Sequence, residues 1–261
     1  MGIIIGGNTF EGTDFNPTGE TGNIINVVTR GLVLWLDAGN NASYANTSNY
    51  YDCGYGCQYY SSNPGCTNCN TQWRDISGYG NDGTIQNGTP ISYNNGGGAF
   101  APTASNHGIQ VTNSSSLINL KTSQGGSGLT VLVWAISNGG TAGSWRKLIG
   151  HGDGDNYIDL YQNPSGYWAQ ECGASLYVDG VSVSNGSYYM PGSGWHLWGA
   201  TSSNSGTLTN PTQTLTIGNE PNLSSYPWTI GEIAVVQIYN RVLTTNEMVQ
   251  NFNNGRQRFG V

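Results

Sequence analysis

A glycine-rich loop carries the two carboxylates of this sequence that are best placed to hold a metal ion. In the stretch His151-Gly-Asp-Gly-Asp-Asn156, Asp153 and Asp155 are followed directly by an amide side chain. Carboxylate and amide oxygens on a flexible backbone are the ligands that calcium prefers. The loop lacks the final glutamate of an EF-hand, and an ordinary turn is the alternative interpretation. Asp153 and Asp155 are therefore predicted as calcium ligands, and calcium is the one cofactor that the sequence suggests.

Four of the five cysteines lie close together, at Cys53, Cys57, Cys66 and Cys69. They could form two disulfides, bind zinc through four thiolates or stay free. We favour disulfides, because the first spacing is looser than the usual C-x2-C pair of a zinc site and no Lys or Arg nearby supports the thiolates. Two disulfides would staple a loop that has no core of its own, and the pairing stays open. They would also indicate an oxidising environment.

Aromatic side chains could supply a carbohydrate-binding surface if amide or carboxylate groups lie beside them. The tyrosines of the cysteine-rich stretch are the strongest candidates, since a stapled loop has little entropy left to lose on binding. Aromatic residues also build sandwich cores, which is the alternative for the tryptophans. The candidates are Tyr55, Tyr59 and Tyr60 in that stretch, and Trp168, Tyr188 and Tyr189 later in the chain.

Catalytic carboxylates are missing at the spacing that glycoside hydrolysis needs. A retaining glycosidase holds two carboxyl groups about 5 Å apart, as two acidic residues on one face of a strand can do. No such pattern begins at any of the glutamates, which are Glu11, Glu20, Glu171, Glu220, Glu232 and Glu247. His107, His151 and His196 have no Ser or Cys nucleophile motif around them. We therefore predict that the chain is not an enzyme.

Composition restricts the class of protein and its partners. Charged residues make up 9% of the chain, where about 25% is typical. The 16 Tyr, 8 Trp and 5 Phe supply the apolar area that disordered chains lack. A net charge of −7, with no basic cluster beyond Arg256 and Arg258, argues against nucleic acid as a partner. No apolar run reaches the roughly 20 residues of a membrane span, and the sequence from Met1 to Ile5 does not resemble a secretory signal.

Short strands between Gly, Asn and Ser turns must position these residues. The stretch 233–239 predicts a central strand covered on both faces, with Ala234, Val236 and Ile238 sharing one face. Dense apolar runs at 32–36 and 129–136 predict two more core strands. Further short strands are expected at 109–111, 147–149, 157–161, 176–178, 195–200 and 214–217. Many short strands of this kind are typical of an antiparallel β-sandwich.

One helix is expected after the central strand. Thr244 and Glu247 form the S/T-x-x-E capping box that begins a helix. Asn254-Gly255 can adopt positive φ and is expected to end it. The sequence therefore predicts a short helix in a chain otherwise made of strands.

Several motifs, in this order, resemble one family. They are G-L-V-L-W-L-D-A-G-N (31–40), W-R-D-I-S-G-Y-G-N-D-G-T (73–84), S-L-Y-V-D-G (175–180), G-x-I-A-x-V-x-I-Y-N-R-x-L-T-x-x-E (231–247) and R-x-R-F-G (256–260). The set resembles laminin-G-like, concanavalin-A-like jelly rolls. The combination of the first two with the last is particularly similar to the lamG-type virion proteins of tailed bacteriophages, cyanophages among them.

The resemblance implies a domain organisation and a function. It implies an N-terminal arm at 1–30 and a jelly-roll sandwich at 31–261, with a Cys/Tyr-rich insertion at about 40–71. The function implied is that of a structural protein on the virion surface, in first place a capsid decoration protein anchored through its arm. A tail-fibre or appendage adhesin that binds host-surface glycan is the alternative, and an exported lectin-like module is the second alternative. Other virion proteins and further copies of the chain are the expected partners.

Overall fold

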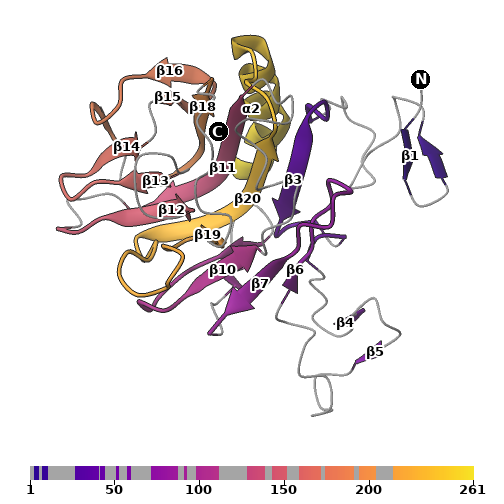
Figure 1. The fold of residues 1–261 in the computed structure, drawn as a ribbon, viewed down its shortest axis with the longest axis horizontal. Helices are drawn as coiled ribbons and strands as arrows, with labels where there is room; N and C mark the ends of the chain where they lie inside the picture. The colour runs from indigo at the N-terminus through magenta and orange to yellow at the C-terminus, as the bar shows by residue number, and fades with distance from the viewer. Residues whose placement is uncertain are drawn as a thin grey trace.

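The structure, a computed structural model, describes the part of the chain that builds the sandwich. The described residues are 27–40, 42–44, 72–87, 98–111, 128–138, 143–151, 159–171, 174–190, 194–203 and 214–261. For residues 3–5, 8–10, 51–52, 58–59 and 91–92 only the strand backbone is described. Two antiparallel sheets face each other and one helix follows the last strand, so the predicted fold class is confirmed (Figure 1).

The front sheet contains the predicted central strand. Its strands are β3 (Leu32–Asp37), β8 (Ile91–Ser92), β9 (Ala99–Phe100), β11 (Leu129–Ser137), β15 (Ser175–Val178), β16 (Val181–Val183), β18 (Trp195–Ser202) and β20 (Gly231–Tyr239). They are ordered β16-β15-β18-β11-β20-β9-β8, and β3 also pairs with β20. β20 therefore lies between β11 on one side and both β3 and β9 on the other.

The back sheet is built from shorter strands. They are β6 (Gln72–Trp73), β7 (Gly83–Gln86), β10 (Gly108–Val111), β12 (Arg146–Gly150), β13 (Asp159–Gln162), β14 (Tyr167–Glu171), β17 (Tyr188–Tyr189) and β19 (Leu215–Ile217). Their order is β17-β14-β13-β12-β19-β10-β7-β6. Two further hairpins are separate two-stranded sheets, β1 (Ile3–Ile5) with β2 (Asn8–Phe10), and β4 (Tyr51–Asp52) with β5 (Gln58–Tyr59).

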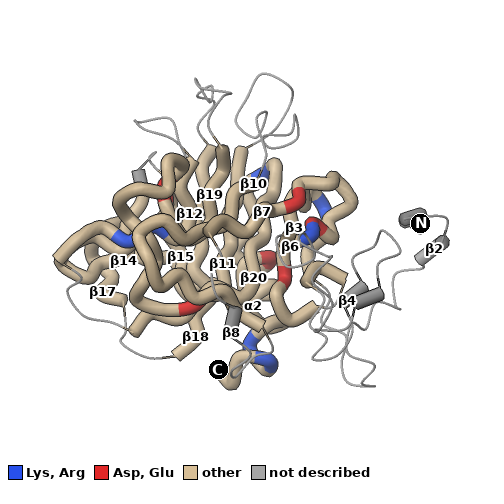
Figure 2. Tube along the Cα trace, turned by 90° about the horizontal axis from the view of Figure 1, so that it is seen from below, with Lys and Arg blue, Asp and Glu red and all other residues tan. Residues whose placement is uncertain are grey.

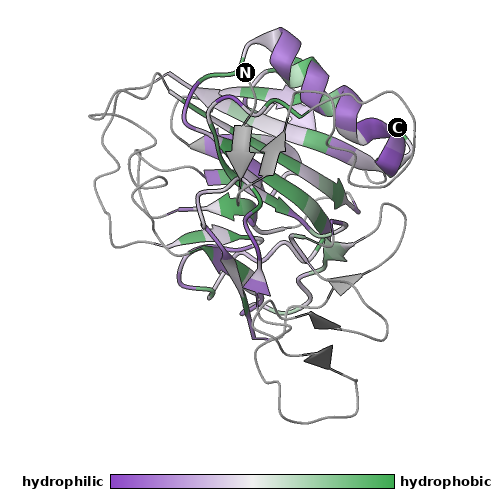
Figure 3. Cartoon of the chain, turned by 90° about the vertical axis from the view of Figure 1, so that its right-hand side faces the viewer, coloured by the Kyte–Doolittle hydropathy of each residue, from purple (hydrophilic) through white to green (hydrophobic). Residues whose placement is uncertain are grey.

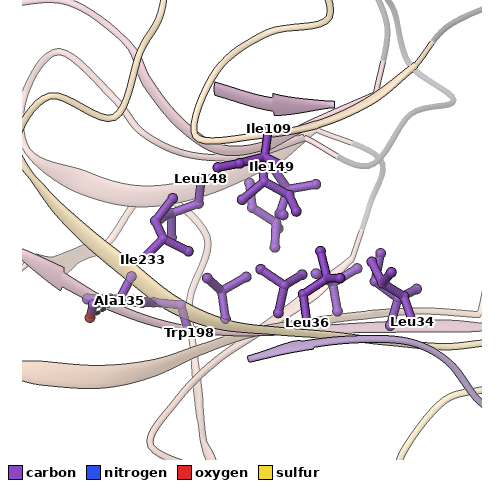
Figure 4. Close-up of a cluster of buried hydrophobic side chains, with 14 of the residues drawn as sticks. Leu34, Leu36, Ile109, Ala135, Leu148, Ile149, Trp198 and Ile233 are labelled. Carbon is purple, nitrogen blue, oxygen red and sulfur yellow. Dashed lines mark hydrogen bonds between the residues drawn. The ribbon is translucent and has the colours of Figure 1, made fainter. Parts of the chain in front are cut away.

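The main core fills the space between the two sheets. Leu34 and Leu36 of β3 face Ile109 and Ile149 of the back sheet, and all four side chains are fully buried (Figure 4). Trp198 lies in the same layer and donates a hydrogen bond from Nε1 to the Ala135 carbonyl at 3.0 Å. The bond satisfies the polar atom that this large ring brings into an apolar layer.

A second core lies between the front sheet and helix α2 (Thr245–Phe259). The helix crosses the outer face of the front sheet and presents hydrophilic residues on its other side (Figure 3). Trp134 stacks on Phe252 and Phe259 at centroid distances of 5.7 and 4.5 Å. Asn251 is buried below the helix, where its Nδ2 donates to the Tyr239 hydroxyl and its Oδ1 accepts from the Val28 N–H. The front sheet is therefore covered on both faces.

The predicted faces of β20 need a correction. Val236 and Ile238 do share the main core, but Ala234 lies in the second core beside Val235. The reason is a β-bulge, since the register with β11 skips Ala234 between Val235 and Ile233. The bulged Ala234 carbonyl accepts a hydrogen bond from Ala38 instead. An extra residue of this kind reverses the alternation of faces, which a period-2 pattern cannot show.

The predicted start of the helix is confirmed and its predicted end is wrong. Thr244 and Glu247 make both bonds of the capping box. The helix continues through Asn254-Gly255 and ends at Gly260, whose φ of 72° is the left-handed C-cap conformation. Gly255 lies against the indole of Trp134, where a Cβ atom would come within 2.6 Å of ring atoms. The glycine therefore serves close packing rather than termination.

Candidate functional site

The D-x-S-G motif organises one end of the front sheet. The Asp75 carboxylate accepts four hydrogen bonds: from the Trp35 N–H, the Ser77 N–H, the Ser77 hydroxyl and the Asn81 N–H, all at 2.8–2.9 Å. The bond from Trp35 reaches out of the loop into β3. A carboxylate has about four acceptor positions, and all of them are used. Asp75 is therefore a structural residue that ties its loop to β3.

The L-D-A-G and R-x-R-F-G motifs meet in space although they lie at opposite ends of the sandwich sequence. Arg258 Nη1 donates to Asp37 Oδ1 at 2.6 Å, and the same oxygen accepts from the Gly39 N–H. A Cβ on Gly39 would overlap the Arg258 guanidinium. The ion pair thus fixes the end of α2 against the turn that follows β3.

A second ion pair fixes the start of the helix. Arg241 binds both Glu247 oxygens, at 2.6 and 2.8 Å, and its Nε donates to the Arg30 carbonyl. The hydrogen bond from Arg241 lowers the pKa of Glu247 to about 2, with help from the Thr244 backbone and hydroxyl. Two ion pairs, Arg258 with Asp37 and Arg241 with Glu247, thus close the sandwich around β20 and α2.

The outer face of the back sheet carries an aromatic ledge, which consists of Trp145, Tyr161, Tyr167 and Tyr189. Tyr167 pairs with Tyr189 across β14 and β17, and their rings meet edge to face at 5.6 Å. Trp145 meets Tyr161 in the same manner at 4.8 Å. Trp145 is 38% exposed and Tyr189 is 47% exposed, whereas most aromatic rings of the sandwich are covered. The ledge therefore exposes two rings, Trp145 and Tyr189, each of which packs edge to face against a neighbouring tyrosine.

An ion pair lies beside the ledge on the same face. Lys147 is opposite Tyr161 in the register, and its Nζ contacts Asp159 Oδ2 at 2.6 Å. The other Asp159 oxygen accepts from the His151 N–H. Both residues of the pair are nearly buried. Asp159 and His151 lie on either side of residues 152–158. The hydrogen bond between them therefore joins the two ends of the loop predicted to bind calcium.

A pocket of about 310 Å³, which we call the Trp195 pocket, lies at the end of the front sheet where β18 and β20 begin and β11 ends. Trp195, Ile136 and Glu232 stand side by side on β18, β11 and β20, as the register of those strands requires. The complete lining is Ala101, Pro102, Thr103, Ile136, Asn138, Trp195, Thr229, Gly231 and Glu232.

The structure places some of the predicted site residues and leaves others outside the described part. Asp153, Asp155, Tyr55 and Tyr60 are outside it, as are Cys53, Cys57, Cys66 and Cys69. Tyr59 is described only as backbone in β5. The calcium, disulfide and tyrosine hypotheses for these residues therefore stay predictions.

The later aromatic candidates separate into core and surface residues. Trp168 is fully buried and packs against Trp198 at 5.2 Å, so it cannot be a sugar platform. Tyr188 also packs on the main core, whereas Tyr189 faces solvent in the ledge. The alternation of faces along β14 and β17 explains this division. Sequence reasoning missed Trp145 and the Trp195 pocket, because no motif marks either of them.

Within the described part of the chain, no group of three or more His, Cys, Asp or Glu side chains is arranged to hold a metal ion. None of its helices is long and apolar enough to cross a membrane.

Comparison with known proteins supports the fold. No protein-family model matches the chain, and no characterised protein matches its sequence. Among solved structures, the binding domain of botulinum neurotoxin DC in complex with SialylT superposes with a TM-score of 0.51 at 11% identity, over 86% of this chain and 52% of that one. At this identity the likeness concerns the fold alone, a β-sandwich.

Sialidases also appear among the structural neighbours. Trypanosoma rangeli sialidase in complex with sialic acid superposes with a TM-score of 0.49 at 14% identity. The match covers 87% of this chain and 33% of the sialidase, so the chain spans about a third of the length of these enzymes.

Proposed function

We propose that this chain is a structural protein on the surface of a tailed-phage virion, and in first place a capsid decoration protein anchored through its N-terminal arm. The observation that best supports a structural role is the use of the motif charges. Asp37, Asp75, Arg241, Glu247 and Arg258 are all engaged in bonds that close the sandwich. The motifs that resemble lamG-type virion proteins thus carry residues that stabilise the domain. The expected partners are other virion proteins and further copies of the chain.

The composition of the surface is consistent with such a coat. Lys, Arg, Asp and Glu are sparse along the described chain (Figure 2). A surface with little charge and many short turns offers few sites for unspecific electrostatic binding. The proposal includes the absence of catalytic activity, which incubation of the purified protein with host polysaccharide, followed by assay of reducing ends, would test.

Localisation on particles is the decisive experiment. Virions would be purified, tested for co-sedimentation of the protein and labelled with antibody for negative-stain microscopy. Labels distributed over the head are expected. Labels confined to the tail tip would transfer support to the adhesin, and absence of the protein from particles would overturn both virion functions.

The second candidate function is a host-surface adhesin that binds glycan, and the aromatic ledge favours it. Exposed aromatic faces that are held rigid by edge-to-face partners can bind apolar faces of sugar rings without a large loss of entropy. Binding of the protein to host cells, compared with its Trp145→Ala and Tyr189→Ala variants, would test this function.

A further inference from the structure

The Trp195 pocket combines features of a small-molecule site that no motif announces. Its volume of about 310 Å³ is at the lower end of the range of about 300–1,000 Å³ that is usual for ligand sites. Such sites are mainly apolar, with a few polar groups that fix orientation. Here Trp195, Ile136 and Pro102 supply apolar surface, and Glu232 and Asn138 supply polar groups.

The walls of the pocket are held by the fold. Buried Asn219 donates from Nδ2 to the carbonyls of Ser105 and His107, both at 2.7 Å, and so fixes the loop that carries Pro102 and Thr103. The Asn138 N–H donates to the Ile230 carbonyl. A ligand would therefore meet a largely preformed site, and preformed sites reduce the entropy cost of binding.

The floor of the pocket is equally fixed. Trp195 packs against Phe259 of α2 at 4.7 Å, and only 6% of its surface is exposed. Its register neighbours Ile136 and Glu232 occupy positions on two long strands, β11 and β20. Glu232, the charged group of the site, is thus placed by a strand.

Glu232 determines which ligands fit. Among the described residues no ion pair includes Glu232, and no Lys or Arg lines the pocket. A carboxylate in this position accepts hydrogen bonds from hydroxyl groups and repels another carboxylate. Asn138, Thr103 and Thr229 can both donate and accept. The set therefore complements a ligand with several hydroxyl groups, an apolar face and no negative charge.

We propose that the Trp195 pocket binds one uncharged pyranose unit of a glycan and excludes acidic sugars. The proposal does not depend on where the protein lies in a virion, and the aromatic ledge is not part of it. The hydroxyl groups of the sugar donate to Glu232 and exchange hydrogen bonds with Asn138, while its apolar face lies against Ile136.

The test uses the full chain and saturation-transfer NMR. The probes are the methyl glycosides of glucose, galactose, mannose and N-acetylglucosamine, with methyl glucuronide and N-acetylneuraminic acid as acidic counterparts. At least one neutral glycoside is expected to bind, and the acidic probes are not. The probes are tested at about 10 mM, ten times the dissociation constant of about 1 mM expected for a weak site. Failure of all four neutral probes to bind, or equal binding of the acidic probes, would overturn the proposal.

Variants locate the bound sugar. Glu232→Gln is expected to weaken neutral binding about tenfold, because a hydrogen bond to a charged acceptor is stronger than one to a neutral acceptor. The same change should allow an acidic probe to bind, which a purely structural role of Glu232 would not produce. Asn138→Ala should weaken binding too, whereas Trp145→Ala on the ledge should leave it unchanged. Binding that is lost in Trp145→Ala and kept in Glu232→Gln would place the sugar on the ledge and overturn the proposal.

Discussion

At the scale of single residues, this molecule uses carboxylates as structural acceptors. Asp75 receives four hydrogen bonds and Glu247 is held by both nitrogens of one guanidinium. In a chain with so few charges, the acceptor geometry of each of these carboxylates fixes the position of the groups that donate hydrogen bonds to it. The consequence is that isosteric changes should be costly.

Asp75→Asn is expected to lower the free energy of unfolding by about 1–3 kcal/mol, because the amide presents N–H groups to partners that are all donors. Asp82→Asn is the matched control, since the only hydrogen bond shown for Asp82 is to the Asp75 N–H. Urea unfolding of both variants measures the difference. A loss in Asp82→Asn as large as in Asp75→Asn would contradict the role given to Asp75.

Glu247 makes a pH-dependent contribution. Its pKa is about 2 in the folded protein, against an ordinary value of 4.5 that applies to the unfolded chain. The ion pair therefore contributes fully to the free energy of unfolding above pH 4.5, and this contribution is lost as pH falls towards 2. Glu247→Gln should cost about 1 kcal/mol at pH 7, as loss of a helix cap does. The cost should shrink at pH 3. Urea midpoints of wild type and variant at both pH values check this, and a difference that is independent of pH would count against it.

At the scale of elements, sequence patterns located the core strands β3, β11, β18 and β20 and the start of the helix, but they missed β14 and β16 and did not show how the elements contact each other. Thr244 and Glu247 predicted the helix start, because a capping box is a local interaction. The bulge at Ala234 and the passage of α2 through Gly255 could not be predicted, because both follow from contacts with β11. For the same reason the sequence did not show the Trp195 pocket, whose lining comes from four separate segments.

Gly255→Ala tests the contact between α2 and Trp134. Helix propensity alone favours alanine by about 1 kcal/mol. We expect the opposite sign, a loss of about 1–3 kcal/mol, because the new methyl group overlaps the indole ring. Asn254→Ala, one position earlier and exposed, should be neutral or slightly stabilising. Thermal unfolding of the two variants decides between local propensity and packing.

At the scale of the whole molecule, the sandwich was predictable because strand patterns, turn residues and motif order all agree. The proposed role of the first thirty residues as an arm is harder to predict from sequence, since the function of an arm depends on the partner that it binds. The described end of this segment already belongs to the sandwich, as Val28 is buried and its N–H donates to Asn251. A deletion that tests the arm should therefore stop at residue 26.

Deletion of residues 1–26 is expected to abolish incorporation into particles and to leave the sandwich folded. Circular dichroism and the urea midpoint of the purified variant check folding, and co-sedimentation with the phage particles that our proposal assigns to the chain checks incorporation. Undiminished incorporation would contradict anchoring through the arm. The full-length protein, added in parallel to particles that lack it, is the control.

The position of β20 in the front sheet has a consequence for how the protein is made. β11, β3 and β9 all pair with this strand, and α2 covers the sheet that it completes. While a ribosome is still translating residue 230, none of these pairings exists, and the edges of the unfinished sheet stay open to other chains. Partners that are far apart in sequence also make folding slow. The sandwich therefore reaches its native pairing only after β20 and α2 have been synthesised, and a chaperone that shields strand edges during that interval should raise the yield of folded protein.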